Sequence, residues 1–347
     1  MSHATDSAAL LNVLYQQFRL AADWNSVQID AVSGGFSGAG VFKVKSAGGT
    51  YCLRRWPLSL TSSARVLAIH QLLAVANRRG PAAVPVPLKA DSGTTLPEIN
   101  GEFWQLEPWM QGAADFSTKP TDERLRSAMF QLARFHNAIR EWAPTAQISQ
   151  WFQPAGLRPS PTIGQRIRMI DSYVATVADF DAALAKETDV RFRDVGSRVA
   201  SVFRRVHSVV KRELMAVQDL VVPLQPCIRD VWHDHLLFDD DELTGIIDFG
   251  AMATDSVSCD LSRLLGSLFG DDFAAWQRGL GNYETVRPMS EAEHRLLRPL
   301  DRSSVLLSGM TWLKRRYVLR NTPIDLSRVC DRLDAIVARL TKLAFDA

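Results

Sequence analysis

The stretch "IRDVWHDHLLFDDDELTGIIDFG", residues 228–250, interrupts the helical periodicity that dominates the C-terminal part of the chain. It contains two short apolar runs, Leu236–Phe238 and Leu243–Ile247, with an acidic turn between them. Short apolar runs on either side of a polar turn are typical of an antiparallel hairpin. Asp230 stands on the loop before this predicted hairpin, and Asp248 stands at the end of its second strand.

A loop and a strand end can place these two carboxylates close together on one side of a turn. Phosphoryl transfer from a nucleotide uses such a pair, because one carboxylate accepts the proton of the attacking hydroxyl and the other holds magnesium between the phosphates. The string Asp-Phe-Gly after a short apolar strand, about twenty residues beyond a loop aspartate, is a fairly specific signal for this chemistry.

The histidines in this stretch favour a different hypothesis, a metallohydrolase built on residues 233–235, "HDH". Such an enzyme requires further metal ligands elsewhere in the chain. The remaining histidines form no other H-x-H or H-x-x-x-D string. The metallohydrolase is therefore the weakest of the hypotheses that the sequence supports.

The N-terminal part of the chain has β character. Residues 27–57 alternate apolar and polar residues in short runs separated by glycines, which predicts antiparallel strands joined by tight turns. Two or three more strands are expected within residues 83–110, with an Asn-Gly turn. Helical periodicity predicts helices at residues 7–21 and 63–79.

From residue 120 onward the chain is mostly helical apart from the hairpin, with two of the helices expected at residues 162–187 and 190–218. We therefore predict an α+β fold with two lobes. Residues 1–110 form a β-rich nucleotide-binding lobe that follows an N-terminal helix. Residues 111–347 form a helical lobe that contains the catalytic loop and the hairpin.

Composition excludes several classes of protein. The 347 residues carry a net charge of only +2, which argues against nucleic acid or an anionic membrane as a partner. Four scattered cysteines form no C-x-x-C pair, and no apolar run is long enough to span a bilayer. The N-terminus does not read as a signal peptide, so we expect a cytoplasmic location. Nothing in the sequence indicates the oligomeric state.

The layout resembles the protein-kinase-like superfamily, and most closely its aminoglycoside phosphotransferase and choline-kinase-like branch. That branch has an H-G-D-x-x-x-x-N loop, a hairpin ending in I-D-F/W and a short D-L segment. This chain has "IRDVWHDH", "IIDFG" and "SCDLSRLL", the last containing Asp260. "SGGFSGAGVFKV" resembles the branch's glycine-rich phosphate-covering turn, and "LARFHNA" resembles its L-x-x-L/F-H helix, with His136 as a structural residue that braces the catalytic loop. The resemblance covers roughly residues 27–265.

The resemblance implies a bilobal protein-kinase-like fold, with a small antiparallel-sheet N-lobe and a large helical C-lobe. It also implies an ATP-dependent phosphotransferase that acts on a hydroxyl of a small molecule. Asp230 takes the catalytic position, and Asp248 takes that of a magnesium ligand. "FWQLEPWMQG" would be the hinge whose backbone pairs with adenine. The residues implied in nucleotide binding are Gly35, Ser37, Gly38, Arg54, Glu107, Trp109 and Met110.

Two departures from the branch concern the nucleotide and the metal. Arg54 stands where the branch has a strand lysine, and the following helix, residues 63–79, contains no acidic residue to pair with it. His70 is the candidate near the middle of that helix. His235 replaces the loop asparagine, and imidazole prefers softer ions than magnesium, such as manganese or zinc.

Two other departures precede the catalytic aspartate. Ile228 replaces the histidine that opens the loop, and Arg229 replaces a glycine. Arg229 is either a phosphate or carboxylate contact or a plain surface charge. On the acceptor side, Trp232 would stack on a sugar or a cation, or else pack against its own lobe. Asp234 is a further candidate near the substrate, or a substitute for His235 at the metal.

These departures leave two hypotheses open on the same fold. In the first, the chain is an active kinase in which His235 is an atypical second metal ligand. In the second, the chain is a pseudokinase-like nucleotide-binding or scaffold protein. The retained Asp230 and Asp248 favour activity. The acceptor itself cannot be read from the helical segment around residues 145–220.

Overall fold

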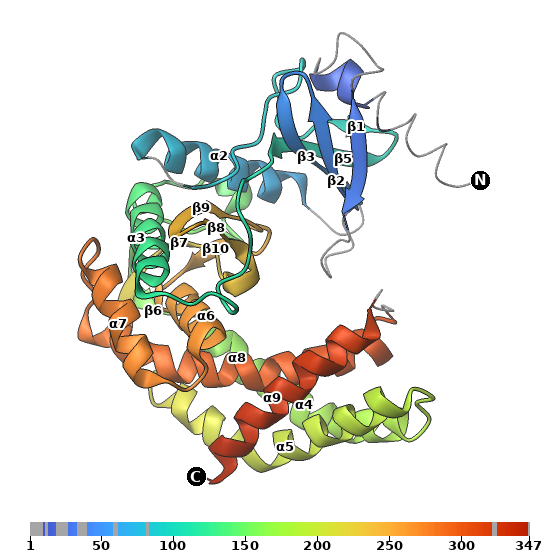
Figure 1. Cartoon of the computed structure of the whole chain (residues 1–347). Coiled ribbons are helices and arrows are strands. Elements are labelled where there is room, and N and C mark those ends of the chain that lie inside the picture. Colours follow the sequence, from blue (N-terminus) through green and yellow to red (C-terminus); the bar gives the residue numbers. More distant parts are fainter. Residues whose placement is uncertain are drawn as a thin grey trace. The chain divides into compact units, whose positions relative to one another are not determined.

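A computed structural model describes most of the chain (Figure 1). The described residues are 10, 13–18, 27–32, 40–57, 62–80, 83–320 and 325–345. They divide into two compact units. The first unit comprises residues 1–154, 233–253 and 285–287, and the second comprises residues 155–232, 254–284 and 288–347. The predicted lobe boundary at residue 110 stays a prediction.

The first unit contains a five-stranded antiparallel sheet in the order β1-β2-β3-β5-β4 (Figure 1). Its strands are β1 Gln28–Val32, β2 Gly40–Ser46, β3 Gly49–Pro57, β4 Glu98–Ile99 and β5 Glu102–Pro108. Alternating side chains of these strands, such as Val44, Leu53 and Leu106, are fully buried and form the core of the sheet. The predicted strands and the Asn-Gly turn between β4 and β5 are confirmed.

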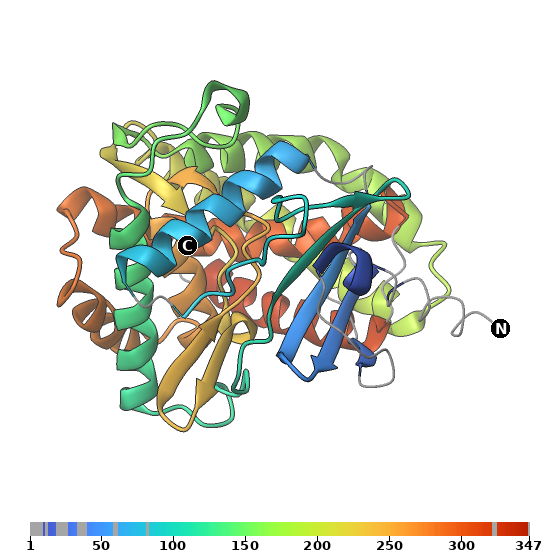
Figure 2. The ribbon, with the colours of Figure 1, turned by 90° about the horizontal axis from the view of Figure 1, so that it is seen from above.

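Helices and a hairpin also belong to the first unit, and residues 13–18, within the predicted N-terminal helix, are helical. Helix α2, Ser63–Arg79, has the predicted bounds, and α3, Asp122–Ile139, begins at Thr121, whose side chain accepts a hydrogen bond from the Arg124 backbone N–H. A short 3₁₀ turn, η3, spans Ala146–Ile148. The predicted hairpin is confirmed as β8, Leu236–Asp239, and β9, Glu242–Ile246. Figure 2 shows this hairpin running beside α3.

The second unit is mainly helical (Figure 1). Its helices are α4 Pro161–Leu184, α5 Val190–Met215, α6 Ser258–Phe269, α7 Phe273–Glu284, α8 Glu291–Tyr317 and α9 Leu326–Phe345. Helices α4, α5, α8 and α9 share one core, and α5 alone buries ten residues at helical spacing, from Phe192 to Leu214. The predicted α+β class, with an antiparallel sheet followed by a helical region, is confirmed.

A small sheet in the second unit was not predicted. It has the order β10-β7-β6, with β6 at Gly156–Pro159, β7 at Val221–Cys227 and β10 at Ala253–Asp255. Two of these strands have only three or four residues, and β7 contains two prolines. Proline lowers the expectation of a strand because it cannot donate to the ladder. Short strands also carry too little periodicity to be recognised.

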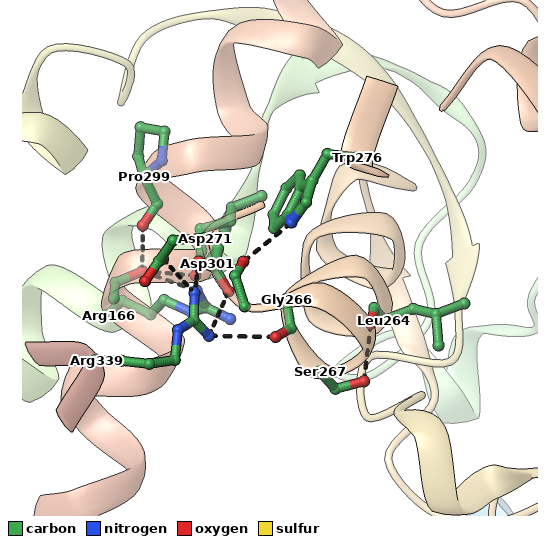
Figure 3. A network of polar contacts seen from close by, with 12 residues as sticks. Arg166, Leu264, Gly266, Ser267, Asp271, Trp276, Pro299, Asp301 and Arg339 are labelled. Carbon is green, nitrogen blue, oxygen red and sulfur yellow. Dashed lines mark hydrogen bonds and ion pairs between the residues drawn. The ribbon is translucent and has the colours of Figure 1, made fainter. Parts of the chain in front are cut away.

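A partly buried ionic network ties α6, α8 and α9 together within the second unit (Figure 3). The Arg339 guanidinium donates to Asp301 at 2.7 Å, to Asp271 at 2.9 Å and to the Gly266 carbonyl at 3.3 Å. Gly266 is required there, because a Cβ atom at this position would lie 2.0 Å from the Asp301 carboxylate. Along the described residues, none of the helices combines the length and the apolar character needed to cross a membrane.

Candidate active site

Arg54 lies in the middle of β3, and its guanidinium lies between two carboxylates of the first unit. One terminal nitrogen is 3.9 Å from a Glu107 carboxylate oxygen, and the other is 3.9 Å from Asp248 Oδ1. Both distances are too long for hydrogen bonds. The Arg54 Nε atom is buried and has no hydrogen-bond partner within the described part of the chain. The guanidinium is therefore attracted by the two carboxylates but retains N–H donors that can bind a ligand.

Asp248 follows strand β9 and has a strained backbone, with φ at +64°. Residues other than glycine rarely adopt a positive φ, and such backbone strain is concentrated at functional sites. His235, at the end of the 3₁₀ turn His233–His235, places Nε2 3.7 Å from Asp248 Oδ2. The structure thus brings together the two residues that the sequence proposed as metal ligands, and it adds Arg54 beside them.

Behind Arg54 lies a chain of buried polar groups. Gln105 Nε2 donates to Glu107 at 2.5 Å, and Gln105 Oε1 lies 3.1 Å from both Trp56 Nε1 and His70 Nε2. His70 Nδ1 is 2.7 Å from the Thr95 hydroxyl. Burial lowers the pKa of His70 to about 4, so its ring is neutral at physiological pH. Burial also raises the pKa of Glu107, although Arg54 and Gln105 act in the opposite direction.

The predicted hinge follows β5. The Trp109 backbone N–H donates to the Thr50 carbonyl at 3.0 Å, so a nucleotide at this hinge would have to use neighbouring backbone groups. The Lys43 ammonium lies 4.4 Å from the Trp109 ring centroid, and the Met110 side chain packs against Gly245 of β9. The predicted phosphate-covering turn, with Gly35, Ser37 and Gly38, lies outside the described residues.

Asp230, the predicted catalytic residue, belongs to the second unit. Its Oδ1 atom lies 3.3 Å from both Nε and Nη2 of Arg263 on α6. Trp232, two residues later, has the guanidinium of Arg332 4.0 Å from its ring centroid and that of Arg263 at 5.9 Å. The predicted acceptor-side tryptophan is therefore held between two cations of its own unit.

Asp260 anchors the backbone of the predicted catalytic loop. It is fully buried, and its two oxygens accept hydrogen bonds from the backbone N–H groups of Ile228 and Arg229, at 2.8 and 2.5 Å. Arg229 itself has a φ of +68°, which this anchor stabilises. The sequence placed Asp260 in the D-L segment but did not assign it a role. Arg263 was not identified at all, although it lies one helical turn beyond Asp260.

Arg229 is held against α4 within its unit, so it is not a plain surface charge, and its predicted phosphate or carboxylate contact stays a prediction. Its Nη2 atom donates to the Thr162 hydroxyl at 3.1 Å and to the Gln165 side chain at 3.0 Å, both on α4. Thr162 also donates to the buried Asp255. His136 is fully buried in α3, as expected for a structural histidine, and its predicted contact with the catalytic loop stays a prediction.

The H-D-H triplet has a simple local geometry. His233 Nε2 lies 3.2 Å from its neighbour Asp234, whereas His235 lies near Asp248. Within the described part of the chain, no group of three or more His, Cys, Asp or Glu side chains is arranged to hold a metal ion. The pair formed by His235 and Asp248 remains the candidate for a metal that takes its other ligands from a bound phosphate and from water.

Comparisons with known proteins identify the family and the fold. A family model described as the phosphotransferase enzyme family matches residues 28–300. A homoserine kinase from Agrobacterium fabrum is 34% identical over 111 residues, which are 28% of this chain and 34% of that protein's length. The chain thus matches about a third of the length of this curated relative.

Two solved structures show the same fold. A spectinomycin phosphotransferase in complex with ADP and spectinomycin has a TM-score of 0.66 at 12% identity, over 96% of this chain and 97% of that one. A microcompartment-associated aminopropanol kinase has a TM-score of 0.61 at 13% identity, over 97% of this chain and 96% of that one. The predicted protein-kinase-like fold is therefore confirmed.

Proposed function

Because the chain belongs to the phosphotransferase enzyme family, we propose that it transfers the γ-phosphate of ATP to a hydroxyl of a small molecule. The observation that carries this proposal is the state of Arg54. Its buried Nε atom has no partner in the described part of the chain, and its terminal nitrogens reach no hydrogen bond with either carboxylate. Bound phosphate oxygens would supply the missing acceptors, because guanidinium binds phosphate through paired hydrogen bonds.

Asp248 and His235 fit a divalent ion that is bound together with the nucleotide. Asp248 offers a half-exposed carboxylate, and His235 offers a ring nitrogen 3.7 Å away. Magnesium in nucleotide sites keeps one or two protein ligands and takes the rest from phosphates and water, so this pair is sufficient. The ion would neutralise charge on the phosphates. The imidazole ligand favours tolerance of manganese.

Asp230 is proposed as the residue that orients the acceptor hydroxyl and takes its proton. Arg263 fixes the carboxylate through two nitrogens of the guanidinium, and Asp260 fixes the loop on which it stands. Trp232 and Asp234 are the proposed acceptor-side residues. The hinge residues Glu107, Trp109 and Met110 and the turn with Gly35, Ser37 and Gly38 complete the proposed nucleotide site.

The second candidate function is nucleotide binding without transfer. The replacement of the strand lysine by Arg54 and the absence of acidic residues from α2 favour it. Against it stand Asp230 and Asp248, the two carboxylates that phosphoryl transfer can least lose. The retained pair makes transfer the better proposal.

The test is an ATP-consumption screen over a panel of hydroxyl compounds with magnesium and with manganese. The panel should include homoserine and short amino alcohols, because a homoserine kinase and an aminopropanol kinase are among the similar proteins. We expect at least one acceptor to be phosphorylated by the natural chain and not by Asp230→Asn. Melting temperatures that ATP does not shift with either metal would exclude the kinase proposal. A shift without turnover of any acceptor would favour the binding protein.

A further inference from the structure

Helix α2 poses a problem that the proposed function does not solve. In the superfamily that the sequence resembles, the phosphate-binding strand lysine is positioned by a glutamate of the following helix. Here α2 contains no acidic residue, and its central polar residue, His70, contacts Gln105 and Thr95 rather than Arg54. Some other group must hold Arg54 if it is to bind phosphate in a defined position.

The register of the sheet places another acidic group, Glu107, beside Arg54. In the antiparallel pair of β3 and β5, Arg54 lies opposite Gln105 and Cys52 lies opposite Glu107. Cross-strand partners share a face, and so do residues two apart along a strand. All four side chains therefore project from the same side of the sheet, and Glu107 is 93% buried beside the Arg54 guanidinium.

The hydrogen bonds around Gln105 all point toward Glu107. The Trp56 indole can only donate, so Gln105 Oε1 is an acceptor and its amide nitrogen must be the donor to Glu107. The neutral His70 then donates to the same Oε1 through Nε2, and its Nδ1 accepts from the Thr95 hydroxyl. One tautomer of His70 satisfies every hydrogen bond in this series. His70 on helix α2 is thereby connected to Glu107 through Gln105.

We propose that Glu107 is the positioning residue of Arg54, in place of the helix glutamate, and that His70 and Gln105 hold Glu107 in position. The proposal rests on the proposed function, because its purpose is to present Arg54 to a nucleotide phosphate. Glu107 also keeps the guanidinium from closing on Asp248, the proposed metal ligand, which lies at the same distance of 3.9 Å.

The experiment compares Glu107→Gln with Glu102→Gln. Glu102 lies on the same strand, on the opposite face of the sheet from Glu107, and pairs with the partly exposed Arg55 at 3.7 Å, so it is a matched ion pair outside the site. Dissociation constants for ATP with magnesium are measured by calorimetry, with circular dichroism as the check on folding. We expect Glu107→Gln to weaken ATP binding about ten-fold and Glu102→Gln less than about two-fold.

A double-mutant cycle with Arg54→Gln separates positioning from a general structural role. If Glu107 acts through Arg54, the Glu107→Gln effect disappears in the Arg54→Gln background. An equal loss in both backgrounds, or equal affinities of Glu107→Gln and Glu102→Gln, would overturn the proposal while leaving the proposed function intact. A natural chain that binds no ATP would overturn both.

A second variant decides the question if Glu107→Gln does not fold. Gln105→Met removes the donor to Glu107 but leaves both charges in place. We expect it to weaken ATP binding about three-fold, less than the loss of the charge itself. ATP affinity unchanged in Gln105→Met would contradict the positioning chain.

Discussion

Two arginine–glutamate pairs, one in each unit, differ in almost every respect. In the helical unit, Arg316 of α8 binds Glu187 through both Nε and Nη2 at 2.9 Å, and the Tyr317 hydroxyl donates to the same carboxylate at 3.1 Å. In the first unit, Arg54 and Glu107 approach no closer than 3.9 Å. The Arg316–Glu187 pair is closed, because both of its partners are joined by hydrogen bonds. The Arg54–Glu107 pair is open and leaves donors of Arg54 without partners in the described part of the chain.

The protonation behaviour of the two glutamates follows the geometry. The hydrogen bonds from Arg316 lower the pKa of Glu187 to about 2, because they favour the charged form. Burial raises the pKa of Glu107, because the distant guanidinium does not offset the loss of water. In a stabilising ion pair, the two side chains use their hydrogen-bonding groups on each other. A pair that leaves its arginine unsatisfied is suited to a ligand, and this is why Arg54 is the better candidate for binding phosphate.

The largest effect on stability is expected for Arg316→Met. It leaves the Glu187 carboxylate in its buried position without its main partner, which costs roughly 3 kcal/mol of unfolding free energy. Urea unfolding measures the loss, and Arg315→Met, which removes only a stacking contact with Trp312, is the matched control. ATP affinity should not change in either variant. A loss of stability no larger than that of the control would show that the closed pair is not a stabilising one.

The complementary variant, Arg54→Met, should act in the opposite way. We expect ATP affinity to fall about 100-fold, or about 2.7 kcal/mol, with a smaller loss of stability than in Arg316→Met, because Glu107, whose pKa is already raised by burial, can take up a proton. Arg55→Met, one residue along β3, is the control for general effects on the strand. If Arg54→Met lowered stability as much as Arg316→Met while ATP affinity was retained, Arg54 would be a structural residue and not a phosphate-binding one.

Lowering the pH should weaken the closed pair. Because the pKa of Glu187 is about 2 in the folded chain against 4.5 for an ordinary glutamate, its contribution is fully present above about pH 4.5. It is lost as pH falls toward 2, and amounts to roughly 2 kcal/mol. Urea unfolding at pH 7, 4 and 3 should therefore show a gap between the natural chain and Glu187→Gln that narrows with falling pH. A gap independent of pH would contradict the assignment.

The same two regions show how far the sequence can be interpreted. The hairpin of β8 and β9 and the bounds of α2 could be predicted because their signals are local: apolar runs around an acidic turn, and a helical period that ends at a glycine. Asp248 and His235 were proposed as metal ligands because the Asp-Phe-Gly string and the resemblance to the phosphotransferase loop place them at the metal-binding positions. The structure places them 3.7 Å apart.

The partner of Arg54 could not be predicted because it depends on strand register. Gln105 and Glu107 alternate along β5, which suggests a shared face, but nothing local specifies that Arg54 lies opposite Gln105. The resemblance instead indicates a partner on the following helix, and it implies only a backbone contact with adenine for Glu107 at the hinge. Asp260 was recognised only as part of the D-L segment, and its role could not be predicted for a similar reason, since its contact with the loop spans about thirty residues of chain.

The smallest effect on stability, and the sharpest contrast with Arg316→Met, is expected for Glu107→Gln. A glutamate whose pKa is raised by burial takes up a proton more readily in the folded chain, so stability is lost as pH rises from the unfolded pKa through the folded one. Removing this carboxylate should leave the unfolding free energy at pH 8 unchanged or raise it by up to about 1 kcal/mol. Urea unfolding at pH 5 and pH 8 checks the sign, since any gain of the variant over the natural chain should grow with pH. A loss of stability at pH 8 comparable with that of Arg316→Met would make Glu107 part of a structural ion pair, and Arg54 would then need no phosphate to complete it.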